Sequence, residues 1–253
     1  MSRRAVILLY HAVDDLAADP VLSPFGVPAA RFGAQLRALR RSGRRFVSLQ
    51  TLLDGLEGRA PLPRRSVLVT FDDAYVSVLE SGVPELRRAG APAVVFAVAG
   101  QLGGTNAWDN QRGTLTLPLL DADGLHRLTD AGIEIGSHAL SHRRLTEIDA
   151  AAVDEELVTS ADLLERAGLP RPRSLAYPHG EVDAHVARAA REAGYAAAFT
   201  IEAGVADART PRMLLPRVVI YAGDSPLAVA VKVLLAGHPR LTAALGRLHG
   251  LRG

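Results

Sequence analysis

Residues 66–73 read Ser-Val-Leu-Val-Thr-Phe-Asp-Asp, a short and mostly apolar run that ends in two carboxylates. A continuous apolar run of this length is typical of a strand that is buried on both faces of a parallel sheet. Two acidic side chains directly after such a strand lie at its carboxyl end, where α/β folds build their sites. This segment therefore predicts the fold class and also the place where the chemistry should be sought.

Similar short apolar runs recur along the chain and alternate with segments of helical periodicity. The predicted strands are Ala5–Tyr10, Ser66–Phe71, Ala93–Ala97, Ile133–Gly136, Ser174–Tyr177, Ala197–Thr200 and Leu214–Ile220. The predicted helices are Val27–Arg41, Asp121–Ala131, Asp149–Ala167 and Glu181–Ala193. This alternation over 253 residues predicts one α/β domain, either a barrel or a doubly wound sheet. No linker divides residues 1–253, and the weakly patterned segment 237–253 is expected to form a loose tail.

Composition excludes several classes of protein and partner. With 29 basic and 27 acidic side chains the formal charge is +2, and the scattered arginines form no stripe for a nucleic acid. The chain has no cysteine, which excludes disulfides and thiolate chemistry. No stretch is long and apolar enough to span a membrane, and Ala5–Tyr10 is too short for a signal peptide. We therefore expect a cytoplasmic protein, and the sequence leaves its oligomeric state open.

Polar side chains follow four of the predicted strands, each at the end where the strand stops. They are His11, the pair Asp72 and Asp73, His138, and His179. In a parallel α/β fold the carboxyl ends of the strands share one face, so four strand ends would deliver these groups to one cleft.

Two histidines and one carboxylate together form a candidate metal site. His138 and His142 are spaced i, i+4, which lets two imidazoles meet one cation from a single turn. With Asp73 they form the ligand set of a catalytic metal site that keeps positions open for water and substrate. The alternatives are a polar surface turn for the histidines and, for Asp72 and Asp73, a helix N-cap near Tyr75.

Three motifs in this order resemble those of the polysaccharide deacetylases, carbohydrate esterase family 4. They are Thr-Phe-Asp-Asp at residues 70–73, His-Ala-Leu-Ser-His at 138–142 and Ala-Tyr-Pro-His-Gly at 176–180. The opening Leu-Tyr-His-Ala-Val at 9–13 resembles the start of the poly-N-acetylglucosamine deacetylase branch of this family. The resemblance extends over most of the chain.

The resemblance implies an irregular (β/α) barrel of about seven parallel strands and metal-dependent removal of an N-acetyl or O-acetyl group from a sugar or glycoconjugate. Asp72 then resembles the general base, and Asp73, His138 and His142 resemble the metal ligands. The backbone N–H of His179 would belong to the oxyanion hole. Zinc is the expected ion for such ligands, with cobalt, nickel, iron and manganese as alternatives.

The chain departs from the family pattern at three positions. Ala176 stands where the third motif usually has the arginine that tethers the base, and Arg217 either reaches the base from the last predicted strand or forms an ion pair at the sheet end. His179 replaces the usual tyrosine. The late histidine motif that supplies the general acid is absent in form, so the acid is His11, His238 or neither, with His11 favoured.

Other functions stay open at this level. One is a deacylase or amidase acting on a small, non-polymeric amide, and another is a catalytically silent carbohydrate-binding protein. The irregular segment Gly100–Pro118 carries the only tryptophan, Trp108, which is either a platform for a sugar ring or an anchor for the loop. Loops of this length in a compact domain are commonly functional.

Overall fold

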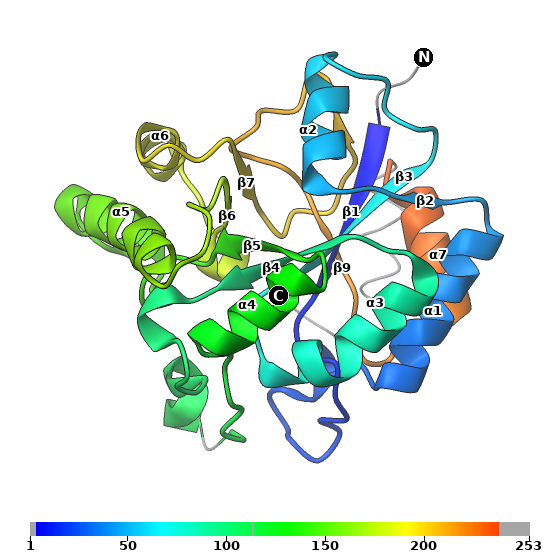
Figure 1. The fold of residues 1–253 in the computed structure, drawn as a ribbon, viewed down its shortest axis with the longest axis horizontal. Coiled ribbons are helices and arrows are strands. Elements are labelled where there is room, and N and C mark those ends of the chain that lie inside the picture. Colours follow the sequence, from blue (N-terminus) through cyan, green and yellow to red (C-terminus); the bar gives the residue numbers. More distant parts are fainter. Residues whose placement is uncertain (1–3, 113, 238–253) are drawn as a thin grey trace.

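The apolar runs of the sequence form one mostly parallel sheet that curls into a half-barrel (Figure 1). The computed structural model describes residues 4–112 and 114–237. The strands are β1 Arg4–Tyr10, β2 Arg45–Phe46, β3 Ser66–Phe71, β4 Ala93–Ala97, β5 Glu134–Ser137, β6 Ser174–Ala176, β7 Ala197–Phe199, β8 Ala206–Asp207 and β9 Val218–Val219. Their order is β7-β6-β5-β4-β3-β1-β8, with β2 paired to β3 and β9 paired to β1. The predicted α/β barrel of parallel strands is confirmed, and β8 alone pairs antiparallel, with β1.

The predicted strand Leu214–Ile220 is shorter in the structure because its residues divide their pairing between the two ends of the sheet. Leu215 forms a parallel bridge with Phe199 of β7, whereas β9 pairs in parallel with β1. Arg217 lies between these two contacts and is fully buried. The segment therefore carries an arginine into the interior of the half-barrel.

Seven α-helices cover the sheet: α1 Ala29–Arg41, α2 Leu49–Glu57, α3 Val83–Ala89, α4 Ala122–Asp130, α5 Ala150–Arg166, α6 Ala184–Glu192 and α7 Pro226–Leu235, within the part of the chain that is described. Four of them match the predicted helices. The side chain of Asp121 caps α4 through the Gly124 N–H at 2.8 Å, and Asp183 caps α6 through Val186. Because Asp183 is the cap, α6 begins later than the predicted Glu181.

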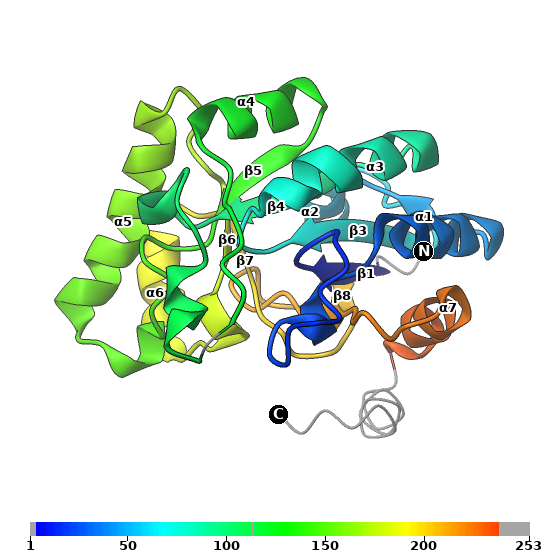
Figure 2. The same cartoon turned by 90° about the horizontal axis from the view of Figure 1, so that it is seen from below.

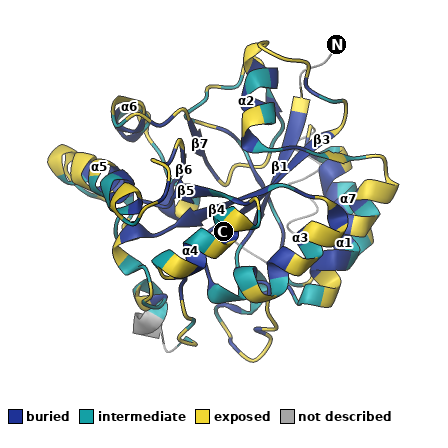
Figure 3. Ribbon diagram, viewed as in Figure 1, coloured by how far each residue is buried: buried dark blue, intermediate teal, exposed yellow. Residues whose placement is uncertain are grey.

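The core divides at the sheet because successive residues of a strand point to opposite faces. On β1, Val6 and Leu8 pack under the outer helices, whereas Ile7 faces the barrel interior with Phe96 and Leu215. A separate cluster lies beneath α5 and α6. The strands are buried and the outer faces of the helices are exposed (Figure 3).

Viewed from below, α1 and α7 pack together beside β1, at the opposite side of the molecule from α5 and α6 (Figure 2). Over residues 4–112 and 114–237, no helix has the length and apolar character needed to cross a membrane. The predicted loose tail and His238 lie outside the described residues, apart from Gly237.

Candidate active site

The carboxyl ends of the strands meet around one cavity, as the sequence predicts. The cavity has a volume of about 570 Å³. Its lining includes the predicted polar residues His11, Asp72, Asp73, His138, His142 and His179. The loop that follows β4 contributes Trp108 and Asp109, and Tyr75 and Tyr221 also line the space.

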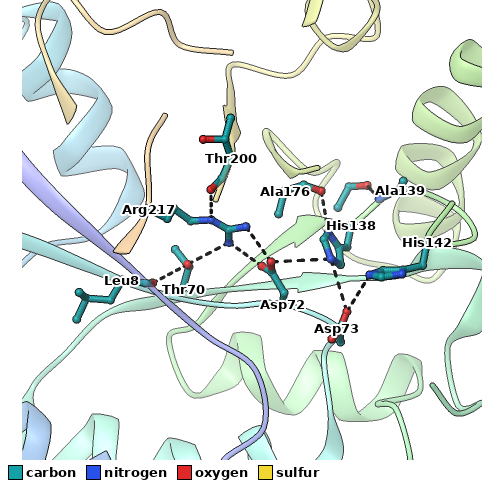
Figure 4. A network of polar contacts seen from close by, with 11 residues as sticks. Leu8, Thr70, Asp72, Asp73, His138, Ala139, His142, Ala176, Thr200 and Arg217 are labelled. Atoms are coloured by element: carbon teal, nitrogen blue, oxygen red, sulfur yellow. Dashed lines mark hydrogen bonds and ion pairs between the residues drawn. The ribbon is translucent and has the colours of Figure 1, made fainter. Parts of the chain in front are cut away.

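Asp72 and Asp73 leave β3 on a turn that sends Asp72 to Arg217 and Asp73 to His142, while Nε2 of His138 lies 3.9 Å from the Asp72 carboxylate and 3.5 Å from that of Asp73 (Figure 4). Asp73 and Ala74 have positive φ values of 73° and 55°, a conformation that L-residues rarely adopt. The next helical segment has Ser77 as its N-cap and no capping side chain. The N-cap alternative is therefore wrong for both residues.

Asp73 faces two imidazoles at distances that suit a shared ion. Its Oδ1 lies 3.5 Å from Nε2 of His138 and 3.4 Å from Nε2 of His142. Two ligand atoms at 2.0–2.1 Å from a tetrahedral ion lie about 3.3–3.4 Å apart, so this spacing fits one cation. The Asp73 Oδ1 atom is buried and has no hydrogen-bond partner among the described residues.

Burial sets the protonation of these three groups. It raises the pKa of Asp73, with a further upward contribution from the neighbouring Asp72, and it lowers the pKa of His138 and strongly that of His142. A divalent cation requires the ionised carboxylate and neutral imidazoles, and its charge stabilises the carboxylate that burial disfavours. The donor set, its spacing and its unpartnered oxygen therefore all fit a divalent metal ion.

Contacts behind the ligands fix their orientation. Nδ1 of His138 donates to the backbone carbonyl of Ala176 at 2.7 Å, which leaves Nε2 free to bind an ion. The indole of Trp108 stacks on the ring of His142, with centroids 4.4 Å apart and planes 22° apart. Tyr75 forms a hydrogen bond to Asp73. Trp108 therefore anchors its loop on the His142 ring and also lines the cavity.

Glu156 of α5 is a residue that the sequence analysis missed. Its buried carboxylate accepts hydrogen bonds from the backbone N–H groups of Leu140 and Ser141 at 2.9 and 3.0 Å, and from the Ser141 hydroxyl. These bonds hold the turn between the two histidines. A glutamate on an amphipathic helix is usually exposed, so the sequence offers no signal that distinguishes Glu156 from its neighbours.

Arg217 clamps Asp72 from the interior of the barrel (Figure 4). Nη1 and Nη2 donate to the two carboxylate oxygens at 2.7 and 2.8 Å, and Nε donates to the Thr200 carbonyl at 2.9 Å. Burial favours the neutral acid, but Arg217 and His138 outweigh it and lower the pKa of Asp72. Arg217 thus reaches Asp72 and forms a buried pair with it.

His11 and His179 also line this cavity. The His11 ring packs on Phe25 with centroids 4.8 Å apart, and its buried Nδ1 has no partner in the described chain. Burial lowers the pKa of His11 to about 4, against the upward effect of Asp72. His179 has a φ of 59°, and its ring stands edge-on to that of His142 at 4.7 Å. The sharp turn continues at Gly180, where a Cβ would lie 2.4 Å from Ile201.

Comparison with known proteins shows which family this chain matches. The sequence profile of the polysaccharide deacetylase family matches residues 59–198. The poly-beta-1,6-N-acetyl-D-glucosamine N-deacetylase of Staphylococcus epidermidis is 21% identical over 214 residues, covering 81% of this chain and 71% of the relative.

Two solved structures have the same overall fold. The Streptococcus pyogenes deacetylase PplD, in complex with acetate, superimposes with a TM-score of 0.77 at 21% identity, covering 92% of this chain and 99% of that one. IcaB of Ammonifex degensii superimposes with a TM-score of 0.75 at 26% identity, covering 91% of this chain and 97% of that one. The chain described here belongs to the polysaccharide deacetylase family.

Proposed function

We propose that this protein is a metal-dependent hydrolase that removes the N-acetyl group from an acetylated amino sugar of a glycan or glycoconjugate. The observation that carries the proposal is the juxtaposition of two carboxylates with different surroundings. Asp73 faces His138 and His142, whereas Asp72, the next residue, is held by Arg217. Such a pair separates the tasks of ion binding and proton transfer.

Asp73, His138 and His142 would hold the ion, and zinc is the ion that this ligand set favours. When bound, a divalent ion supplies Lewis acidity, which polarises the amide carbonyl and makes the attacking water more acidic. Three protein ligands leave coordination positions for water and substrate. An amide is a poor electrophile, and this explains why the site would combine an ion with a dedicated base.

Asp72 would accept the proton of the attacking water. The bidentate clamp of Arg217 keeps this carboxylate ionised and fixes its direction, and a carboxylate oxygen that accepts one hydrogen bond retains a second lone pair. The backbone N–H of His179 would donate to the oxyanion that develops on the carbonyl oxygen. Such a donor, already fixed by the turn at residues 178–180, lowers the barrier because it does not need to reorganise.

His11 would donate a proton to the departing amine. Its ring lines the same cavity, and its lowered pKa makes it neutral at pH 7 in the free protein. His11 must therefore receive a proton during the reaction cycle before it can donate one. This requirement distinguishes His11 from a histidine that enters the cycle already charged.

The test is the release of acetate from N-acetylglucosamine oligomers by the zinc-loaded protein. Asp72→Asn should keep the ion and lose most turnover, whereas His142→Ala should lose the ion as well, measured by metal analysis after dialysis. Full activity of Asp72→Asn would remove Asp72 as the base. Release of acetate from small amides alone would instead indicate an amidase, and saturable glycan binding without turnover would indicate a silent binding protein.

A further inference from the structure

The amino ends of the same strands carry arginines that the proposed reaction does not use. Arg4 opens β1, Arg44 precedes β2, and Arg64 and Arg65 precede β3. The three strands are neighbours and run parallel, so these residues meet at one end of the sheet. The active-site cavity lies at the opposite end, at the carboxyl ends of β1 and β3.

These four arginines line a second cavity, with a volume of about 480 Å³, which we call the arginine pocket. Its remaining lining residues are Ala5, Val6, Val205, Val233, Leu234 and Gly237. The arginine pocket therefore combines an apolar floor with a cationic rim, and among residues 4–112 and 114–237 no carboxylate lines it. An apolar wall reduces the screening of nearby charges, which strengthens their attraction for an anion.

Within the described part of the chain, three of the four rim arginines have no carboxylate partner. Arg44, Arg64 and Arg65 form no ion pair with a residue of the described chain. Burial, and then the charge of Arg65, lower the pKa of Arg44. Arg4 alone has a carboxylate beside it, that of Asp207, its partner across the β1–β8 pairing. An anion bound at the rim would relieve the repulsion between Arg44 and Arg65.

The backbone around the rim is held in an uncommon conformation. Arg65 has a φ of 61°, and its Nη1 donates to the carbonyl of Ser42 at 3.2 Å. Gly43 has a φ of 78°, and a Cβ there would lie 3.0 Å from the same Nη1. This hydrogen bond joins the segment that carries Arg65 to the segment that carries Arg44. Left-handed non-glycine residues are concentrated at functional sites because the surrounding structure must stabilise them.

We propose that the arginine pocket binds a phosphate-bearing anion, at a site separate from the active site. Guanidinium groups bind phosphate oxygens through two parallel N–H donors, which makes arginine more suitable than lysine for this purpose. The apolar floor would contact the non-phosphate part of the same molecule. Two sources share this chemistry, a soluble phosphate compound and the headgroup of a phospholipid, and the experiment separates them.

The first measurement is calorimetric titration of the full chain with sodium pyrophosphate at constant ionic strength. We expect saturable binding that Arg44→Gln and Arg64→Gln each weaken by about tenfold, as for the loss of one charge-assisted hydrogen bond. Arg166→Gln is the matched control, because Arg166 is exposed on α5 and the net charge changes equally. His142→Ala is the control for binding in the active-site cavity and should bind pyrophosphate as the unaltered protein does.

The second measurement is co-sedimentation with phosphatidylglycerol vesicles, with phosphatidylcholine vesicles as the neutral control. Sedimentation that requires Arg44 and Arg64 assigns the phosphate to a lipid headgroup, whereas pyrophosphate binding without sedimentation assigns it to a soluble compound. Absence of binding to both probes overturns the proposal. Equal weakening by Arg166→Gln, or loss of binding only in His142→Ala, overturns it as well. The two arginines are at the surface rim, and circular dichroism verifies that each variant is folded.

Discussion

Arg217 is a fully buried guanidinium, and its charge is balanced by Asp72. The faces of Phe96 and Phe199 lie 5.7 and 6.0 Å from its central carbon, which adds a weak cation–π attraction on two sides. The sequence could identify Arg217 as a candidate tether but could not exclude a surface ion pair. Which of the two applies depends on how the segment around Arg217 pairs with β7 and with β1. These are long-range contacts, and a local sequence pattern does not contain them.

The first prediction concerns this pair. Arg217→Gln should lower kcat for acetate release by about 100-fold, because the proposed base loses both its orientation and the charge that keeps it ionised. It should also lower the free energy of unfolding by about 3 kcal/mol, since a buried carboxylate is left unpaired. Steady-state kinetics and urea unfolding measure the two effects. Arg209→Gln, an exposed arginine nearby, is the control, and unchanged kinetics in Arg217→Gln would remove the tether from the mechanism.

The second prediction, also about one residue, tests His11 as the acid. His11→Ala should lower kcat for an N-acetyl sugar by about 100-fold, because the amine leaves poorly without a proton. It should change kcat for 4-nitrophenyl acetate by less than about twofold, because a nitrophenolate leaves without protonation. The comparison of the two substrates separates an acid from a residue that merely shapes the cavity. Equal losses on both substrates would contradict the acid role.

At the scale of elements, the sequence predicts the main strands and the polar residues at their carboxyl ends. It does not predict several helices or the contacts that those helices make. The strands are continuous apolar runs, and this pattern is local. The sequence pattern does not identify α2, α3 or α7. Helix α3 is short and continues from a π-helical turn at Val78–Gly82, and α7 is apolar along most of its length, so neither shows a clear helical period. The turn between His138 and His142 depends on α5, which follows it in the sequence and contacts it through Glu156. Only the packed structure shows this contact.

The third prediction belongs to the contact between α5 and that turn. Glu156→Gln should weaken zinc affinity by about 10- to 100-fold, because a neutral amide oxygen accepts the N–H groups of Leu140 and Ser141 less strongly than the carboxylate does, and the turn between the histidines loses support. A competitive titration with a chromogenic chelator measures the affinity. Glu155→Gln, the exposed neighbour on the same helix, should leave it unchanged. Equal affinities in the two variants would show that the histidine turn holds its shape without Glu156.

The fourth prediction concerns two loops that Asp19 joins near the cavity. Oδ1 accepts the N–H groups of Val21 and Leu22 at 2.7 Å each, and Oδ2 accepts the N–H of Leu115 at 2.5 Å. These backbone donors lower the pKa of Asp19. A lowered pKa means that the carboxylate stabilises the fold above its unfolded pKa, near 3.9, and that this stabilisation is lost as the pH falls through the folded value.

Asp19→Asn should therefore be less stable than the unaltered protein at pH 7, with a difference that shrinks as the pH falls below 4. Urea unfolding of both proteins at several pH values measures the difference. Asp15→Asn is the control, because Asp15 is exposed in the same segment. A difference that does not depend on pH would show that ionisation of Asp19 is not what stabilises the loops, and equal stability of the two proteins at pH 7 would show that the amide supports the loops as well as the carboxylate does.

Across the whole molecule, the strands β1 and β3 connect two cavities of different character. Their carboxyl ends carry His11 and the Asp72–Asp73 pair, and their amino ends carry the arginines of the second cavity. Apart from Ser66 and Thr70, the residues of these strands between the two ends are apolar and buried, so apolar side chains separate the two cavities. This separation makes it reasonable to alter one cavity and expect the other to keep its function.

A buried ion pair closes the half-barrel beside β1 by joining α7 to the segment that follows β9. Lys232, the only lysine of the chain, donates through Nζ to Asp224 Oδ2 at 2.5 Å and to the Val219 carbonyl at 3.3 Å. The same Oδ2 accepts the N–H of Tyr221 at 2.8 Å. The pair thus fastens α7 to the segment that follows β9 and carries Tyr221 to the active-site cavity.

The fifth prediction tests this closure with a double-mutant cycle. Asp224→Ala should lower the free energy of unfolding by about 3 kcal/mol, because it leaves the Lys232 ammonium buried without a carboxylate, and Lys232→Met should cost a similar amount. The double variant Asp224→Ala/Lys232→Met should be more stable than the sum of the two single changes implies, because no unpaired charge remains and methionine fills the space of the lysine stem. Urea unfolding of the four proteins gives the coupling energy. Strict additivity would mean that α7 is held by its apolar face alone, through residues such as Val229 and Val233, and that the ion pair is incidental to the closure.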